Sequence, residues 1–188
     1  MTWDRERRLV MGYEERFWQL VEKRSIILFG DINADKQEGI TLAITSLNGH
    51  STGPIKFLLD SSGGTASHTL IIHDTLVHSL APVNGLIMGK AHSGAFILSQ
   101  AFKRRVAYPH ATFIIHGPSL DGLRSDDKDL AGKIQFRKDI HTEMLNIIAR
   151  RTGQPMKKLR EWSREERVFT AREALKLNFI DEIAEPPK

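Results

Sequence analysis

Gly89-Lys-Ala-His-Ser-Gly-Ala95 lies between an apolar run, 83–88, and a run with helical spacing, 95–101. This order predicts that Ser93 occupies a sharp turn from a strand to a helix, where acyl-transfer enzymes expose a nucleophile. Upstream, Asp60-Ser-Ser-Gly-Gly64 follows another strand-like run, so two glycine N–H groups can face a developing negative charge. The sequence therefore favours a hydrolase that works by acyl transfer.

Composition narrows the class of protein. The chain has 188 residues, 40% hydrophobic and 27% charged, which is typical of a single globular domain. The lack of cysteine excludes disulfides, thiolate catalysis and cysteine-based zinc sites. No apolar run approaches the ~18 residues of a membrane span, and residues 1–12 lack the apolar core of a signal peptide. We therefore expect a cytoplasmic protein with no membrane partner.

The net charge of +4 does not by itself predict nucleic-acid binding. The basic residues are scattered in small clusters near expected helix ends, where cations complement the helix dipole. No aromatic residues interleave them, as they would in a single-strand binder. We expect no nucleic-acid partner.

Strand and helix patterns alternate along the chain. We expect strands at 25–29, 55–59, 83–88, 106–108, 112–116 and 168–169. We expect helices at 13–23, 35–47, 66–80, 94–102, 127–152, 156–162 and 170–177. Repeated strand-helix-strand units with short turns predict an α/β fold with a parallel sheet flanked by helices, and functional loops at the carboxyl ends of its strands.

A serine nucleophile needs a base and an orienting carboxylate. His116 ends an apolar strand and faces the loop side of the predicted sheet, which suits a base for Ser93. An anionic carboxylate must hold the imidazole in the correct tautomer. Glu166 is the candidate, with Glu165 and Asp181 as rivals.

The backbone amides of Gly64 and Gly94 are the candidates for an oxyanion hole, with Gly63 in the same substrate-binding loop, because glycine permits close approach of substrate. Each feature also has a structural alternative. A serine at a helix start is commonly an N-cap, two glycines can simply turn the chain, and His116 can be a strand-end residue bonded to backbone.

The other histidines are weaker candidates. His92 adjoins Ser93, but neighbouring side chains diverge, so we expect His92 to line a substrate pocket rather than act as its base. The spacing of His73 and His78 is not that of a helical metal site, and no metal is expected. We expect loop or surface positions for His50, His110 and His141.

The ordered set of motifs resembles the ClpP family of serine peptidases, the proteolytic subunits of Clp proteases. The family's N-S-P-G-G loop corresponds to 60–64 and its G-Q-A-A-S-M motif to 89–94, without a gap between them. Ser93 then falls on the family nucleophile, and Gly94 stands where the family has methionine. The family's M-I-H-Q-P resembles 114–118, and its R-D-R-F-L-S resembles 165–170. The resemblance thus implies His116 as the base and Glu166 in the place of the family aspartate.

A second alignment is available for the same segment. Matching the family's S-M-G-A-F to His92-Ser-Gly-Ala-Phe96 would put His92 on the nucleophile position and require an insertion upstream. The gapless alignment instead shortens a surface turn near 102–105, where deletions are best tolerated. We therefore expect Ser93 to be the nucleophile.

The resemblance implies a ClpP/crotonase-like fold with a protruding handle helix at about 127–152. It implies a charged N-terminal segment at 1–12, a peptidase domain at 13–183 and a tail at 184–188. The implied activity is hydrolysis of peptides or unfolded polypeptides through an acyl-enzyme, inside a homo-oligomeric chamber of heptameric rings, as a single or double ring. It implies no metal or organic cofactor. An AAA+ unfoldase is an implied partner, although 1–12 has little in common with the family's gating segment. The alternatives are an inactive ring subunit and a crotonase-like acyl-CoA enzyme.

Overall fold

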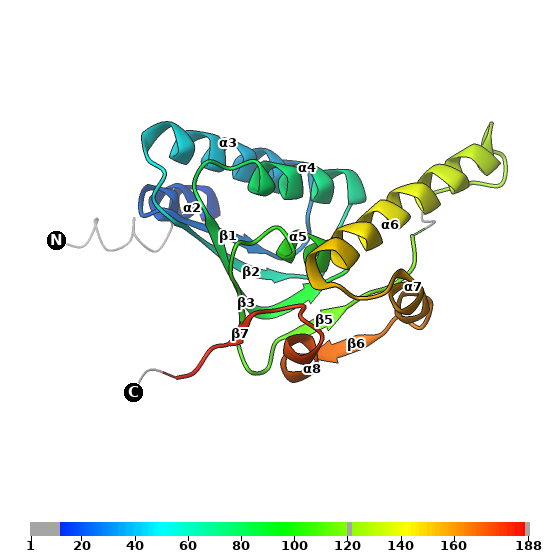
Figure 1. Cartoon of the computed structure of the whole chain (residues 1–188). Helices are drawn as coiled ribbons and strands as arrows, with labels where there is room; N and C mark the ends of the chain where they lie inside the picture. The colour runs from blue at the N-terminus through cyan, green and yellow to red at the C-terminus, as the bar shows by residue number, and fades with distance from the viewer. Residues whose placement is uncertain (1–11, 120–121, 187–188) are drawn as a thin grey trace.

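A sheet of seven strands forms the centre of this computed structural model in the residues that it describes, 12–119 and 122–186 (Figure 1). The strands are β1 (Ser25–Phe29), β2 (Ile55–Ser61), β3 (Val83–His92), β4 (Arg105–Ala107), β5 (Thr112–Ile114), β6 (Val168–Thr170) and β7 (Glu182–Ile183). The helices are α2 (Tyr13–Glu22), α3 (Ala34–His50), α4 (Ala66–Val77), α5 (Gly94–Ser99), α6 (Leu130–Thr152), α7 (Met156–Arg164) and α8 (Ala171–Lys176). Most of the predicted segment 1–12, and the end of the predicted tail, lie outside the described residues.

The sheet has the order β1-β2-β3-β4-β7, and all neighbours along this path run parallel. The first half of β3 pairs with β4 and its last three residues pair with β5. The α/β prediction is confirmed. The sheet is mixed rather than purely parallel as predicted, because β6 pairs antiparallel with β5. The reason is the route of the chain: α6 and α7 carry it away from β5, and the turn at 165–167 returns it in the opposite direction.

Two predicted boundaries differ from the observed ones in a way that affects the site. β3 continues to His92, four residues beyond the predicted end, because residues Lys90, Ala91 and His92 pair with β5. The helix predicted from 127 begins at Leu130, where the Asp129 side chain accepts a hydrogen bond from the Gly132 amide as an N-cap. The strand β7 was not predicted at all.

An aromatic cluster joins the elements around the carboxyl end of β3. Phe96 of α5 packs edge-on against Phe113 of β5, with ring centroids 5.7 Å apart, and against Phe179, at 4.9 Å. Phe169 of β6 packs in the same way against Phe179 (5.1 Å) and against Trp162 of α7 (5.3 Å). Edge-to-face contacts of this kind add to the stability given by burial. The cluster therefore fixes α5, β5, β6 and α7 relative to one another.

A buried arginine on β4 links the sheet to the residues just before β7. Arg105 of β4 is 1% exposed, and its guanidinium donates to the Asp181 carboxylate, to Gln100 Oε1 and to both oxygens of Asn178. Three of the guanidinium nitrogens thus take part in hydrogen bonds. The Arg105 guanidinium lowers the pKa of the Asp181 carboxyl by hydrogen bonding, against the effect of burial, which raises it. This network joins β4 to the segment before β7.

The handle prediction fits the placement of α6. Figure 1 shows this helix extending away from the sheet at its N-terminal end. Its buried residues all lie in its C-terminal half: Met144, Leu145, Ile148 and Thr152. Gly153, in the left-handed conformation, ends the helix as predicted. Among the described residues, none of the helices combines the length and apolar character needed to cross a bilayer.

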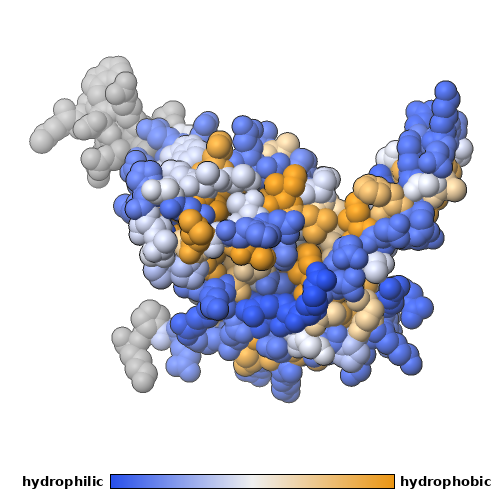
Figure 2. All heavy atoms as spheres, turned by 45° about the horizontal axis from the view of Figure 1, so that its top comes forward, coloured by the Kyte–Doolittle hydropathy of each residue, from blue (hydrophilic) through white to orange (hydrophobic). Residues whose placement is uncertain are grey.

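Exposed apolar side chains gather on two parts of the surface. Leu42 of α3 and Ile71 and Val77 of α4 are exposed, and so is Phe136 on the outer part of α6. Figure 2 shows orange patches over the α3–α4 face and along the projecting helix. Apolar patches of this kind, set among polar residues, are typical of surfaces that another molecule covers.

Candidate active site

Ser93 occupies a sharp turn between β3 and α5. Its backbone has φ 52° and ψ −124°, a left-handed conformation that residues other than glycine rarely adopt. Main-chain hydrogen bonds hold it, because the Ser93 amide donates to the Ile114 carbonyl (2.9 Å) and its carbonyl accepts from the Phe96 amide (3.0 Å). A serine at a strained strand-to-helix junction has the geometry of a nucleophile elbow.

The simplest alternative for Ser93 is a helix cap. Ser93 does stand at the N-cap position of α5, but its side chain makes no capping hydrogen bond. An N-cap serine stabilises a helix by accepting from an amide of the first turn, and that contribution is missing here. Helix capping therefore does not explain why Ser93 adopts a strained backbone conformation.

Gly63 packs directly against this turn. Its φ is +95°, and a Cβ at this position would lie 2.6 Å from the His92 carbonyl oxygen and 2.9 Å from the Gly94 nitrogen. Only glycine fits without a shift of the backbone. The Ile32 amide donates to the Gly63 carbonyl (2.7 Å), which fixes the loop from the side of β1. The glycine loop and Ser93, separate in the sequence, are therefore in contact.

The Gly64 and Gly94 amides are spare hydrogen-bond donors. In the parallel bridge between Ile32 and Gly64, the Ile32 amide donates to the Gly63 carbonyl and the Thr65 amide donates to the Ile32 carbonyl, so the Gly64 amide is not used. Within residues 12–119 and 122–186, neither the Gly64 nor the Gly94 amide donates to a protein acceptor. Amides without partners beside a serine turn can bind an oxygen that becomes negatively charged. Both amides predicted to form the oxyanion hole are therefore without an acceptor among the described residues.

His116 lies two residues beyond the end of β5. Its Nδ1 is 2.7 Å from the Gly117 carbonyl oxygen, and because a carbonyl only accepts, Nδ1 carries the proton. In the neutral ring Nε2 is then unprotonated and can accept a proton. The tautomer is the one that a general base requires.

The sheet brings Ser93 and His116 to the same edge. β3 pairs with β5 in parallel register, with His92 opposite Ile114, so both chains leave the sheet side by side. However, in the described part of the chain no hydrogen bond joins the Ser93 hydroxyl to the His116 ring. Ser93 and His116 therefore follow neighbouring strands at one edge of the sheet, and no hydrogen bond joins their side chains among the described residues.

Glu166 lies in the turn that precedes β6. It has φ 50°, and its side chain is exposed. The next residue, Arg167, accepts a hydrogen bond from the Ile115 amide (3.2 Å), which attaches this turn to the strand that leads into His116. Glu166 makes no hydrogen bond to His116 among the described contacts, and Gly117 accepts from Nδ1 instead. The Glu166 turn is thus attached to the segment that leads into His116, but the Glu166 carboxylate is not hydrogen-bonded to the His116 ring among the described contacts.

The rivals of Glu166 differ in their freedom. The Asp181 carboxylate is engaged by Arg105 through the side chain and the main chain, with Arg105 N to Asp181 Oδ2 at 2.7 Å. Glu165 ends α7 and is exposed, like Glu166. The network of Arg105 therefore leaves the two neighbouring glutamates as the available carboxylates.

His92 points into the sheet edge. Its Nε2 is 2.9 Å from the Thr112 hydroxyl of β5, and burial and then the charge of Lys90 lower the pKa of the His92 ring, against the opposing charge of Asp60. His92 is the last residue of β3 and not the turn residue. This placement favours the alignment that puts Ser93, rather than His92, at the elbow.

The expectation of a surface position for His141 is wrong. This residue of α6 is half-buried, with Nε2 3.1 Å from the His116 carbonyl oxygen and 2.9 Å from the Ser163 hydroxyl. Burial lowers the pKa of the His141 ring. The sequence carries no signal for this contact, because its partners lie 25 and 22 positions away on other elements.

The lowered pKa values of His92 and His141 predict a pH-dependent stability. The unfolded chain binds more protons than the folded chain once the pH falls below the ordinary histidine value of about 6.5, so the free energy of unfolding decreases in that range. We expect the Tm measured by calorimetry to fall between pH 7 and pH 5. The fall should be smaller in a His141→Gln variant, and an equal fall in both proteins would contradict the assignment.

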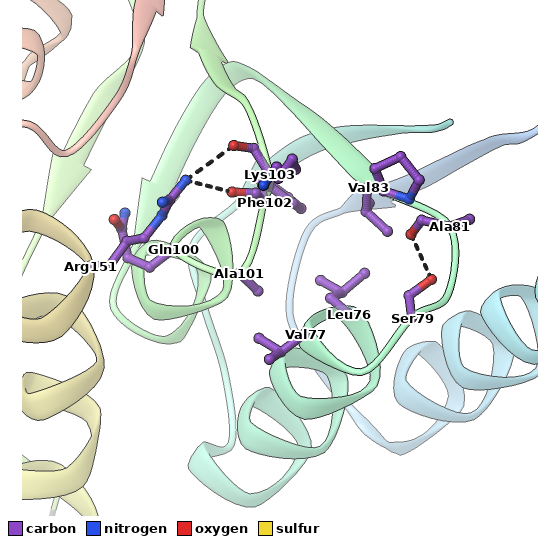
Figure 3. A pocket seen from close by; sticks show the side chains of 11 residues that line it. Leu76, Val77, Ser79, Ala81, Val83, Gln100, Ala101, Phe102, Lys103 and Arg151 are labelled. Atoms are coloured by element: carbon purple, nitrogen blue, oxygen red, sulfur yellow. Dashed lines mark hydrogen bonds between the residues drawn. The ribbon is translucent and has the colours of Figure 1, made fainter. Parts of the chain in front are cut away.

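One hollow of the surface is lined by residues outside the proposed site. It has a volume of about 310 Å³ between the end of α4 and the end of α5, and Arg151 closes it by donating to the Phe102 and Lys103 carbonyls (Figure 3). Ser93, His116 and Glu166 do not line it. In the described chain, no group of three or more histidine, aspartate or glutamate side chains is placed to hold a metal ion.

Comparison with known proteins points to one family. The family described as Clp protease matches residues 12–187. The chain is 33% identical over 168 residues to the ATP-dependent Clp protease proteolytic subunit 2 of Mycolicibacterium paratuberculosis, covering 88% of this chain and 84% of the relative. It is 32% identical, with the same coverage, to proteolytic subunit 1 of Mycobacterium bovis. A solved structure of a ClpP1 mutant from Listeria monocytogenes has a TM-score of 0.81 at 20% identity, covering 91% of this chain and 96% of that one.

Proposed function

The chain belongs to the Clp protease family, and on that premise we propose that it is a serine endopeptidase that cleaves through an acyl-enzyme. The observation that carries the proposal is the turn at Ser93: a strained serine with no capping bond, packed against Gly63 and followed by the free amide of Gly94. A folded chain keeps backbone strain of this kind where it serves a function.

The proposed reaction begins with attack of the Ser93 hydroxyl on the scissile carbonyl carbon. His116 Nε2 takes the hydroxyl proton, and the carbonyl oxygen becomes an oxyanion that the Gly64 and Gly94 amides stabilise. The C–N bond then breaks, and His116 returns the proton to the leaving amine. A water molecule then gives a proton to His116 and attacks the acyl carbon. The bond between this carbon and Ser93 Oγ breaks, and His116 returns the proton to Oγ as the carboxylic acid leaves. The amides of Gly64 and Gly94, which have no acceptor among the described residues, and the unprotonated Nε2 of His116 would supply the donors and the base for these steps.

We propose that Glu166 orients His116 in the catalytic state. The Gly117 carbonyl holds Nδ1 in this structure, and it selects the same tautomer that a carboxylate would select. A carbonyl stabilises the imidazolium formed during reaction less well than a carboxylate does, because it carries no net charge. Movement of the turn at 165–167 toward His116 would exchange the carbonyl for Glu166.

A pair of neighbouring variants tests this role. Glu166→Gln keeps the size of the side chain and removes its charge, and it is expected to lower kcat for peptide hydrolysis by about 10²- to 10⁴-fold. Glu165→Gln, one position away, should leave kcat within about threefold of the wild type. Steady-state kinetics with a fluorogenic peptide measure both. The reverse order would make Glu165 the third residue, and no loss in either would leave the role to Gly117.

We further propose an assembly of copies of this chain into rings, with peptides or unfolded polypeptides as substrates. The exposed apolar residues on α3, α4 and α6 support this, because association would cover them (Figure 2). Heptameric rings, single or stacked, a partnership with an AAA+ unfoldase and a cytoplasmic location stay predictions from the family resemblance.

One observation favours a second function, that of an inactive ring subunit. Ser93 and His116 are not hydrogen-bonded in the described chain, and neither are His116 and Glu166. Hydrolysis of short fluorogenic peptides by the assembled wild-type protein tests the two functions. Saturable cleavage supports the peptidase. Intact rings without cleavage, and without any reaction of Ser93 with a phosphonate, would support the inactive subunit.

A further inference from the structure

The His116 main chain is held from two sides. On one side, the amide of the preceding Ile115 donates to the Arg167 carbonyl (3.2 Å). On the other side, His141 of α6 reaches the carbonyl oxygen of His116 itself, with its Nε2 3.1 Å away. The proposed base therefore depends on a side chain that takes no part in the reaction steps.

Hydrogen-bonding rules define the state of His141. Because the His116 carbonyl only accepts, His141 Nε2 must carry the proton of this bond. The Ser163 hydroxyl oxygen is 2.9 Å from the same nitrogen, so it and the His116 carbonyl both accept from the one N–H of His141 Nε2. Burial lowers the pKa of the His141 ring, so at neutral pH the ring is neutral and donates from Nε2 alone.

Among the described residues, the bond from His141 is the only hydrogen bond to the peptide unit between His116 and Gly117. The His116 carbonyl belongs to this unit, and the next carbonyl, of Gly117, accepts from His116 Nδ1. A Cβ on Gly117 would meet only the Ser163 carbonyl oxygen, at 4.0 Å, and glycine itself has no side chain that could anchor this peptide unit. The bond from His141 therefore restrains the unit that sets the orientation of the imidazole.

We propose that His141 is a positioning residue for His116, acting through the His116 carbonyl. The proposal rests on the function of His116 as the base. The bond restrains the backbone that carries the imidazole, and loss of the bond lets the ring leave the orientation that transfer of the Ser93 proton requires. Misplacement of a catalytic group by about 1 Å can lower a rate by about 100-fold.

A matched pair of variants separates the hydrogen bond from the packing. His141→Met has a similar size and no donor, whereas His141→Gln places an amide N–H near the position of Nε2. We expect kcat for peptide hydrolysis to fall at least about tenfold in the methionine variant, with KM within about twofold. The glutamine variant should recover most of the loss. Equal kcat in wild type and His141→Met would overturn the proposal, as would equal losses in both variants.

Ser163→Ala is the control for a purely structural link. It removes the hydrogen bond between Ser163 of α7 and His141 of α6 and keeps the bond from His141 to His116. We expect its kcat within about threefold of the wild type. A loss as large as that of His141→Met would show that His141 only ties the two helices together, and it would overturn the positioning role.

Hydrogen–deuterium exchange gives a readout that needs no activity. The amides of residues 115–117 and 119 should exchange at least about threefold faster in His141→Met than in the wild type, and in His141→Gln their exchange rates should return toward those of the wild type. Unchanged exchange would overturn the proposal even if the protein hydrolyses no peptide. A wild type that cleaves nothing, with the expected exchange pattern, would contradict the proposed function and leave the hydrogen-bond role of His141 supported.

Discussion

Replacement of Ser93 by alanine is expected to lower kcat for peptide hydrolysis by about 10⁵- to 10⁶-fold, the size of loss seen when a serine nucleophile is removed. The reason is that Ser93 is the single residue between β3 and α5, at the turn where the glycine loop packs and where the Gly94 amide has no acceptor among the described residues. Removal of one oxygen leaves the packing of this turn in place, so assembly and Tm should change little. Steady-state kinetics with a fluorogenic peptide measure the loss.

Ser67→Ala is the matched control for this change. Ser67 is an exposed serine in the first turn of α4, near the glycine loop in sequence but outside the proposed chemistry. Its replacement should leave kcat within about threefold of the wild type. Activity of Ser93→Ala close to that of the wild type would contradict the nucleophile assignment.

The largest expected effect on stability comes from Arg105. Arg105→Met is expected to lower the free energy of unfolding by about 2–4 kcal/mol, because the buried guanidinium makes several hydrogen bonds to charged and polar partners and each such bond contributes about 1–3 kcal/mol. The variant leaves the Asp181 carboxylate without its cation and Gln100 Oε1 without its donor. Urea unfolding followed by circular dichroism measures the change.

The neighbouring arginine is a matched control. Arg104 pairs with Glu182 at the surface, where the side chains are 60% and 46% exposed. Because water screens this pair, Arg104→Met should change the free energy of unfolding by less than about 1 kcal/mol. Similar losses of the free energy of unfolding in Arg105→Met and Arg104→Met would contradict the claim that burial makes Arg105 the more stabilising of the two arginines.

The proposed site was largely accessible from the sequence because its parts are local. The strand-to-helix turn at Ser93 and the strand end at His116 each depend on a few adjacent residues, and parallel strands bring such ends to one edge. Gly63 is also a local signal, since its φ of +95° leaves no room for a side chain. The triad assignments remain predictions, but the segments that carry them do meet at one edge of the sheet.

The misjudged features depend on partners far apart in the sequence. β3 runs past Gly89 because its last three residues pair with β5. Gly89 allows the Asp60 carboxylate to approach closely, since a Cβ at 89 would lie 2.9 Å from it. The direction of β6 depends on the path of two helices. His141 lies on a helix with polar neighbours, and nothing in that pattern indicates that its ring reaches the carbonyl of His116.

Reaction of the assembled protein with a fluorophosphonate, followed by peptide mass spectrometry, tests the central claim most directly. The probe forms a covalent adduct only with a serine that a nearby base activates. We predict one adduct per chain, on Ser93, with none in the Ser93→Ala variant. An adduct on another residue, an equal adduct in the variant, or no adduct in the wild type would contradict the proposal that Ser93 is the nucleophile of a serine peptidase.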